Sequence, residues 1–179
     1  MEKHLASISK YLSFILRHKP ESIGLTLDNF GWADIHSLIT KTIDYQLTPE
    51  VINLVVQTND KQRFVIDESG KKIRANQGHS IEIDLNLEAS IPPSKLLHGT
   101  AIRFYDAIQV EGLTKQKRHH VHLTECAKVA ESVGGRYGKP ILLEVDTKEM
   151  VSEGYLFYKT ANKVWLVNEV PAKFLNRKS

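Results

Sequence analysis

Apolar residues recur at helical spacing from the start of the chain. Leu5, Ile8 and Leu12 fall on one face of a helix, with largely polar residues between them. Pro20 cannot continue a helix, because its ring removes a backbone donor and clashes with the preceding turn, so we expect this helix to end near His18. Cations at that end could simply complement the helix dipole, an effect worth about 0.3 to 1 kcal/mol.

Two shorter helices and a hairpin are expected next. Apolar positions within 35–39 and 51–55 keep helical spacing, and Thr48 followed by a proline is typical of the start of a helix. The apolar runs 64–66 and 72–75 flank a turn that contains glycine, which indicates a β-hairpin. Three helices followed by a hairpin is the order of a winged-helix module, and such modules commonly bind nucleic acid.

A change of composition separates the two halves of the chain. Residues 81–93 are acidic and end in two prolines, which cannot join a regular helix or a central strand. We therefore interpret this segment as a linker and place a boundary near Pro92. The sequence predicts two lobes, one at 1–92 and one at 93–179.

The second lobe alternates short helices with strands. One helix is expected to be stopped by Gly112, and another is expected to start at Thr124 and to end at Gly134. The runs with strand character lie at 96–100, 120–123, 141–145, 155–158 and 164–167. The chain as a whole is therefore predicted to belong to the α+β class.

Composition excludes several classes of protein. A hydrophobic share of 41% with 25% charged residues is ordinary for a globular protein, and a net charge of +3 permits nucleic-acid binding without demanding it. No apolar run approaches the roughly 18 residues that a membrane span needs. The single cysteine, Cys126, excludes an internal disulfide, and the cytoplasm is the expected compartment.

Metal and thiol chemistry have little support. A metal at His120 and His122 would have to tolerate the neighbouring Arg118, and the spacings typical of zinc sites are absent. Cys126 falls inside a predicted helix with apolar neighbours, so we interpret it as a buried structural residue. Glycine-rich fingerprints of phosphate loops and of Rossmann-type dinucleotide sites are absent as well. We expect no metal.

Three arginines lie where little carboxylate is available to neutralise them. Arg17 precedes a histidine at a helix end, Arg63 lies in a basic segment before the hairpin, and Arg118 precedes a histidine-rich strand. A guanidinium stays charged and presents forked donors that match phosphate oxygens, so converging arginines suit a phosphate better than a metal. The sequence therefore predicts phosphate chemistry without a metal.

The hairpin region carries further basic residues. No carboxylate lies between Ser69 and Ser80, and we assign Lys61 and Arg74 to contacts with RNA. For the lysines of the turn itself we favour a solvated surface that binds nothing. Residues 76–80 place four hydrogen-bonding side chains around a glycine, which suits a tight turn that presents donors to a ligand.

A set of short motifs, in a fixed order, resembles a known family. The motifs are Leu16-Arg17-His18-Lys19-Pro20, Gly31-Trp32, Lys61-Gln62-Arg63-Phe64, Ile73-Arg74-Ala75-Asn76-Gln77-Gly78-His79-Ser80, Leu97-His98-Gly99-Thr100, His120-Val121-His122-Leu123, Gly138-Lys139-Pro140 and Val164-Trp165-Leu166. Together they are similar to the NAD-dependent RNA 2′-phosphotransferases (tRNA 2′-phosphotransferases) over nearly the whole chain. The resemblance implies a winged-helix RNA-binding lobe at 1–92 and an NAD-binding lobe of the ADP-ribosyltransferase fold at 93–179.

The resemblance also implies an activity. Members of this family remove an internal 2′-phosphate left at an RNA ligation junction, as in tRNA splicing. The phosphate attacks the nicotinamide ribose of NAD and expels nicotinamide, and the adjacent 2″-hydroxyl then attacks the phosphorus. The products are 2′-hydroxyl RNA and ADP-ribose 1″,2″-cyclic phosphate, formed through an ADP-ribosylated RNA. NAD is therefore expected as co-substrate, with no metal.

The functional residues of the family carry over onto matching positions. The catalytic group that the resemblance implies, and that we expect to meet at one site, is Arg17, His18, Arg63 and Arg118. The NAD contacts that it implies are His98, Gly99, Thr100, His122 and Val164. The chain departs from the family in two places. Gln116-Lys117 replaces a frequent methionine and glycine, and Lys163 replaces a frequent glycine.

Two other functions fit parts of the sequence. A winged-helix nucleic-acid binder with an inert second lobe would explain the basic hairpin but would leave Arg118 without a purpose. An ADP-ribosyltransferase that caps terminal phosphates would share the first chemical step and lack the second. The preferred partner is RNA carrying a 2′-phosphate, and we expect a monomer because no coiled-coil heptad or long exposed apolar edge is visible.

Overall fold

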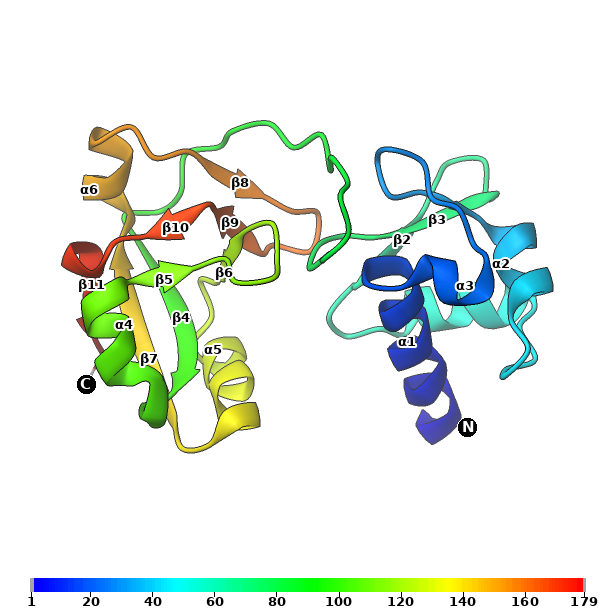
Figure 1. Ribbon diagram of the computed structural model, residues 1–179, viewed down its shortest axis with the longest axis horizontal. Helices are drawn as coiled ribbons and strands as arrows, with labels where there is room; N and C mark the ends of the chain where they lie inside the picture. The colour runs from blue at the N-terminus through cyan, green and yellow to red at the C-terminus, as the bar shows by residue number, and fades with distance from the viewer. Residues whose placement is uncertain (1, 179) are drawn as a thin grey trace. The chain divides into compact units, whose positions relative to one another are not determined.

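The computed structural model describes residues 2–178 and divides the chain into two compact units, Met1–Asn86 and Leu87–Ser179 (Figure 1). The division falls a few residues before the boundary expected near Pro92. Ala89 forms a bridge with Tyr158, and the Ser90 N–H donates to the Phe157 carbonyl oxygen over 2.8 Å. The end of the expected linker is therefore paired with a strand of the second unit.

The first unit contains three helices, one helical turn and a small sheet. Its elements are α1 (Glu2–Arg17), η1 (Pro20–Ile23), β1 (Ala33–Asp34), α2 (Ile35–Lys41), α3 (Pro49–Gln57), β2 (Phe64–Ile66) and β3 (Lys72–Ala75). The strands pair antiparallel in the order β1-β3-β2. The predicted helices and hairpin are confirmed, whereas the short strand β1 was not expected.

Local chemistry accounts for the ends of these helices. The side chain of Thr48 accepts a hydrogen bond from the Val51 N–H over 3.3 Å, and Asp34 accepts one from the Ser37 N–H over 2.7 Å. Both bonds satisfy amides that the first helical turn leaves without partners. At the other end of α1, Pro20 starts a separate 3-10 turn, so α1 stops at Arg17.

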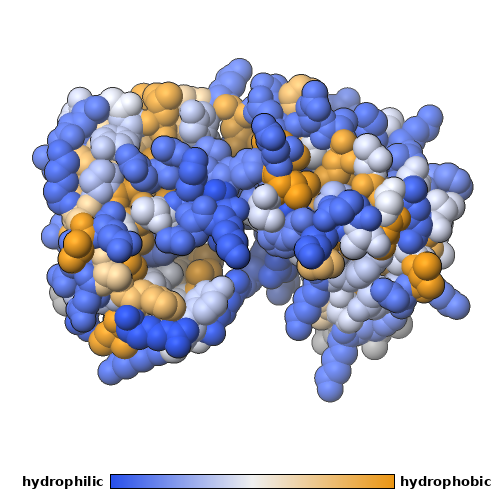
Figure 2. All heavy atoms as spheres, in the orientation of Figure 1, coloured by the Kyte–Doolittle hydropathy of each residue, from blue (hydrophilic) through white to orange (hydrophobic). Residues whose placement is uncertain are grey.

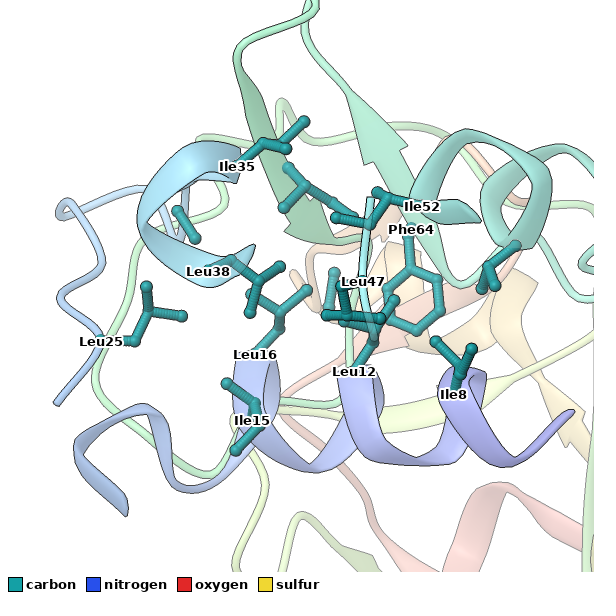
Figure 3. Packing of buried hydrophobic residues seen from close by; sticks show 14 residues of the cluster. Ile8, Leu12, Ile15, Leu16, Leu25, Ile35, Leu38, Leu47, Ile52 and Phe64 are labelled. Carbon is teal, nitrogen blue, oxygen red and sulfur yellow. The ribbon is translucent and has the colours of Figure 1, made fainter. Parts of the chain in front are cut away.

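One face of α1 forms the base of the first core. Ile8, Leu12 and Leu16 are fully buried and point toward α2, α3 and the hairpin (Figure 3). They pack in one cluster with Leu38 of α2 and with Phe64 of β2. The predicted apolar stripe is therefore the surface on which the other elements of this unit assemble.

The second unit combines antiparallel sheets with short helices. Its elements are β4 (Lys95–Ala101), η2 (Ile102–Phe104), α4 (Tyr105–Glu111), β5 (Leu113–Thr114), β6 (Val121–Leu123), α5 (Ala127–Gly134), η3 (Gly135–Tyr137), β7 (Pro140–Asp146), α6 (Thr147–Ser152), β8 (Phe157–Lys159), β9 (Trp165–Val167), β10 (Glu169–Val170), η4 (Ala172–Phe174) and β11 (Leu175–Arg177). The sheet orders are β11-β7-β4, β6-β9-β8 and β10-β5. A bridge between Leu97 and Thr124 connects the first two sheets. With its helices and strands, the chain is an α+β protein, as predicted.

Helix α5 lies against strand β4 (Figure 1). A Cβ atom at Gly99 would lie 1.7 Å from the Ala130 carbonyl oxygen, and one at Gly134 would lie 2.6 Å from the Thr100 carbonyl oxygen. Real Cβ atoms do not approach backbone that closely, because interiors are already packed to van der Waals contact. Two glycines therefore allow this helix and strand to touch.

The start of α5 differs from the prediction. Thr124 exchanges two backbone hydrogen bonds with Leu97 and so belongs to the sheet, and α5 begins only at Ala127. Cys126 occupies the N-cap position and is exposed, so the interpretation as a buried structural cysteine is wrong. Periodicity could not reveal this, because the strand-to-helix transition depends on pairing with a distant strand.

Apolar side chains are scattered among hydrophilic ones over the visible face of the molecule (Figure 2). Within residues 2–178, none of the helices combines the length and the apolar character that crossing a bilayer requires.

Candidate functional site

Arg17 and His18 lie at the carboxyl end of α1. The His18 and Lys19 N–H groups both donate to the Phe14 carbonyl oxygen, over 3.0 and 3.1 Å, which tightens the last turn. Arg17 is partly buried and His18 is exposed. The end of the helix thus presents a guanidinium and an imidazole side by side in sequence.

Residues 76–80, here the 76–80 turn, connect this helix end to Arg63. The Ser80 N–H donates to the Arg17 carbonyl oxygen over 2.9 Å, and the Ser80 hydroxyl lies 2.9 Å from Nδ1 of His18. At the other end of the turn, the Asn76 N–H donates to the Arg63 carbonyl oxygen over 2.9 Å. Three of the four predicted catalytic residues therefore bond to one short segment.

Asn59 is a second anchor for Arg63, and the sequence analysis missed it. Its buried side-chain oxygen accepts from the backbone N–H and from Nη1 of Arg63, each over 3.3 Å, and its amide donates to the Ser9 hydroxyl over 2.8 Å. This asparagine therefore connects Arg63 to helix α1. Only its position just before the basic segment hinted at such a role.

The 76–80 turn also differs from its prediction. Asn76 and Gln77 are buried, and the Asn76 side-chain amide donates to the Gln62 carbonyl oxygen. Gly78 has φ +87°, a left-handed conformation that glycine adopts without steric cost. At least one of the expected ligand donors is therefore used inside the protein, where it ties the turn to the segment before β2.

Arg74 stacks on Trp32. The guanidinium carbon lies 4.6 Å from the ring centroid, and Nη1 donates to the Phe30 carbonyl oxygen over 3.5 Å. Burial lowers the pKa of Arg74 and the charge of Asp28 opposes that shift, and the side chain stays charged because the ordinary pKa of a guanidinium lies far above neutrality. Lys61, the other residue assigned to RNA, is exposed ahead of β2. These contacts give Arg74 structural partners within the first unit.

Arg118 belongs to the second unit, in the turn before β6. Its N–H donates to the Lys115 carbonyl oxygen over 2.9 Å, and Nη1 donates to Nδ1 of His122 over 3.4 Å. The side chain of Arg118 is exposed.

Strand β6 has the predicted alternation: Val121 and Leu123 are buried, while His122 is partly exposed. His120 lies just before the strand, with its ring 5.7 Å from that of Tyr158.

His98 lies beside His122 and Arg118 in the second unit. Its Nδ1–H donates to the His122 carbonyl oxygen over 3.0 Å. Burial lowers the pKa of His98, the bond to His122 opposes that shift, and the charge of Arg118 reinforces it. A neutral imidazole protonated on Nδ1 leaves Nε2 as an acceptor. His98 can therefore accept a hydrogen bond from a hydroxyl group.

The other residues assigned to NAD have structural explanations too. Gly99 allows α5 to approach β4, and Thr100 is buried against Gly134. Val164 precedes β9, where its N–H donates to the Thr160 hydroxyl over 3.0 Å and its carbonyl accepts from the Thr160 N–H over 2.9 Å. Lys163 has φ +63°, a left-handed conformation that glycine adopts without steric cost.

Metal ligands are not clustered in the part of the chain that the structure describes. Among residues 2–178, no three or more His, Cys, Asp or Glu side chains are placed to hold one metal ion.

The predicted site residues form two groups of arginine and histidine. Arg17, His18 and Arg63 share one neighbourhood in the first unit, and Arg118, His122 and His98 share one in the second.

Comparison with known proteins agrees with the resemblance of the motifs. The model of the RNA 2′-phosphotransferase, Tpt1 / KptA family matches residues 3–169. Probable RNA 2′-phosphotransferases of Acaryochloris marina and Flavobacterium johnsoniae are 48% identical over 176 residues and 47% identical over 182 residues. These matches cover 97% of both chains in the first case and 100% of both in the second. The chain therefore belongs to the RNA 2′-phosphotransferase, Tpt1 / KptA family.

Proposed function

We propose that this protein removes an internal 2′-phosphate from RNA by transferring it to NAD. The RNA would be of the kind that ligation leaves at a splice junction, and the products would be 2′-hydroxyl RNA, nicotinamide and ADP-ribose 1″,2″-cyclic phosphate. Membership of the family supports the phosphotransferase activity. The identity of NAD as the acceptor and the form of the products rest on the resemblance of the motifs.

One observation carries the proposal furthest. The 76–80 turn bonds to the consecutive residues Arg17 and His18 and to Arg63, which lies far from them in sequence. Packing alone would not require the same few residues to anchor two arginines and a histidine. This arrangement supports a site for a phosphate in the first unit, whereas the place of Arg118 in the catalytic group rests on the resemblance of the motifs.

Arginine side chains suit this role because a 2′-phosphomonoester carries a charge of about −1.5 to −2 near neutral pH. A pair of unit charges 4 Å apart is worth about 4 kcal/mol at an effective dielectric constant of 20. Arg17, Arg63 and Arg118 would dock the phosphate and stabilise the charge that develops during its transfer. The same charges would favour the dianion as a nucleophile without the help of a metal.

His18 is the proton-transfer residue of the proposal. It could protonate the departing RNA oxygen or take the proton from the ribose hydroxyl in the second step. Both roles belong to the step that releases the repaired RNA. We therefore expect His18→Ala to slow the second step most and to accumulate ADP-ribosylated RNA. An unchanged second step in this variant would remove His18 from the mechanism.

The second unit has groups that fit a ribose. When bound, NAD would supply the electrophilic ribose carbon and nicotinamide as leaving group. His98 would accept a hydrogen bond from a sugar hydroxyl through Nε2, because its Nδ1–H already donates to His122. Val164 would place an apolar side chain, rather than a carboxylate, beside the ribose. This suits an anionic nucleophile, which needs no base and would be repelled by a negative charge. Gly99, Thr100 and His122 complete the proposed contacts.

Lys61 and Arg74 would contact the RNA from the first unit. Phosphate contacts by lysine and arginine are electrostatic, so binding through them should weaken as salt rises. The stacking of Arg74 on Trp32 is compatible with a contact of this kind, because a guanidinium can stack on a ring and still donate at its edge.

Product analysis tests the proposal. Purified protein with NAD and an RNA carrying one internal 2′-phosphate should yield nicotinamide, 2′-hydroxyl RNA and the cyclic phosphate. Omitting NAD, or using the same RNA without the 2′-phosphate, should give no product. A stable ADP-ribosylated end on a terminally phosphorylated RNA, with no release of 2′-phosphate, would favour a capping enzyme. Binding without any reaction would favour a nucleic-acid binder.

A further inference from the structure

We propose that Ser80 positions the imidazole ring of His18. This inference rests on the function proposed above, in which His18 transfers a proton. Its hydroxyl oxygen lies 2.9 Å from Nδ1 of His18, within ordinary hydrogen-bond distance. The partners are far apart in sequence, so tertiary structure rather than local geometry brings them together.

The backbone of Ser80 is attached to the same helix end. Its N–H donates to the Arg17 carbonyl oxygen over 2.9 Å, so Ser80 bonds to two consecutive residues of the site. Farther along, the Asp84 N–H donates to the Asn29 carbonyl oxygen over 2.8 Å. Before it, Asn76 is anchored to Arg63. The segment is thus fixed on both sides of Ser80, and its hydroxyl has a defined position before any ligand binds.

This bond determines which nitrogen of His18 can act on a substrate. The two ring nitrogens lie on different edges of the imidazole, so with Nδ1 engaged by Ser80 the chemistry falls to Nε2. A hydroxyl can both accept and donate. Its oxygen can accept from Nδ1–H both when the ring is charged and when the ring is neutral with Nε2 deprotonated. Ser80 can therefore keep the ring in one orientation while Nε2 gains or loses a proton.

The requirement for a fixed ring has a physical basis. A catalytic group misplaced by about 1 Å can lose about a hundredfold in rate, because orientation is part of the barrier. His18 is exposed and lies beyond the last helical residue, so little packing restrains its side chain. The hydrogen bond at Nδ1 is then a contact that directs the ring.

The test uses the full-length protein and three variants. Ser80→Ala removes the hydroxyl, and Ser80→Thr keeps it. Ser22→Ala is the matched control, because the Ser22 hydroxyl also makes one exposed bond near the same helix end, to the Lys19 carbonyl oxygen over 2.7 Å, without touching His18. We expect Ser80→Ala to slow turnover at saturating substrate about ten- to a hundredfold, with little change in KM for the RNA. Ser80→Thr and Ser22→Ala should stay close to the wild type.

A spectroscopic measurement tests the same contact without catalysis. In protein with ¹⁵N-labelled histidine, Ser80→Ala should move the His18 Nδ1 resonance and leave that of the exposed His36 in place, and Ser80→Thr should restore it. An unmoved His18 resonance in Ser80→Ala would overturn the inference, as would a Ser80→Thr variant as slow as Ser80→Ala. If the wild type removed no 2′-phosphate, the proposed function would fail, whereas the resonance would still report on the contact.

Discussion

Replacing Gly99 by alanine should destabilise the second unit severely. The added Cβ would lie 1.7 Å from the Ala130 carbonyl oxygen, and the atoms that it meets belong to the backbone of α5 rather than to a flexible side chain. The helix would have to move away from β4. Overpacking of this kind typically lowers the free energy of unfolding by about 1 to 3 kcal/mol and occasionally more. Because the clash at Gly99 is with backbone, which cannot move aside easily, we expect a loss of about 3 kcal/mol or more.

A loss of that size is easily measured. One kcal/mol shifts Tm by about 4–8 °C in a domain of 60–100 residues, so a fall of roughly 12 °C or more is expected. The chain has two tryptophans, Trp32 in the first unit and Trp165 in the second. In a Trp32→Phe background, fluorescence during heating therefore reports on the unit that contains Gly99. Measurements without NAD separate packing from any contact with the ligand.

Gly135→Ala is the matched control. Gly135 has ordinary helical φ and ψ, and a Cβ there would meet no atom within 4 Å. Alanine should be neutral or stabilising by about 0.4 to 1 kcal/mol, because it restricts the unfolded chain. If Gly99→Ala melted at the same temperature as Gly135→Ala, the close approach of α5 to β4 would be incorrect. Gly99 would then be explained by ligand contact alone.

Three further changes test other parts of the structure. Lys163→Gly should raise the free energy of unfolding by about 0.5 to 1 kcal/mol in urea, because Lys163 has φ +63°; a loss of stability would argue against that conformation. Because burial lowers the pKa of His98 from 6.5, the unfolded chain gains a proton there first as pH falls. Stability should therefore decrease below pH 6.5, and His98→Asn should flatten that decrease in urea titrations at several pH values; an identical slope would show that His98 is not buried in the neutral form. Leu12→Ala should cost about 2 to 5 kcal/mol in urea, against a smaller loss for the partly buried Leu5→Ala, because Leu12 is fully buried; equal losses would contradict the packing of α1.

The site was partly visible in the sequence, and its supports were not. Arg17, His18 and Arg63 stand out because their charges lack nearby carboxylates and fall in recognisable motifs. Asn59 and Ser80 carry no such signal, since asparagine and serine are common in turns of every kind. Their roles depend on Arg63 and His18 arriving at hydrogen-bond distance from elsewhere in the chain.

The misinterpretation of Cys126 has the same origin. Apolar neighbours made the segment resemble the interior of a helix, whereas pairing between Leu97 and Thr124 delays α5 to Ala127 and leaves Cys126 exposed at its start. Gly99 shows a different limit. The motif containing it indicated a ligand contact, and only the three-dimensional structure shows Ala130 against its α-carbon.

By itself, the sequence determined most of the longer helices and strands, the α+β class and the family, because periodicity, turn residues and ordered motifs are properties of neighbouring positions. Tertiary structure decided which side chains meet. The bonds from the 76–80 turn to Arg17 and Arg63, and the contact of α5 with β4, join residues that are distant in the chain. Such contacts arise from packing of the whole unit, and no local pattern encodes them.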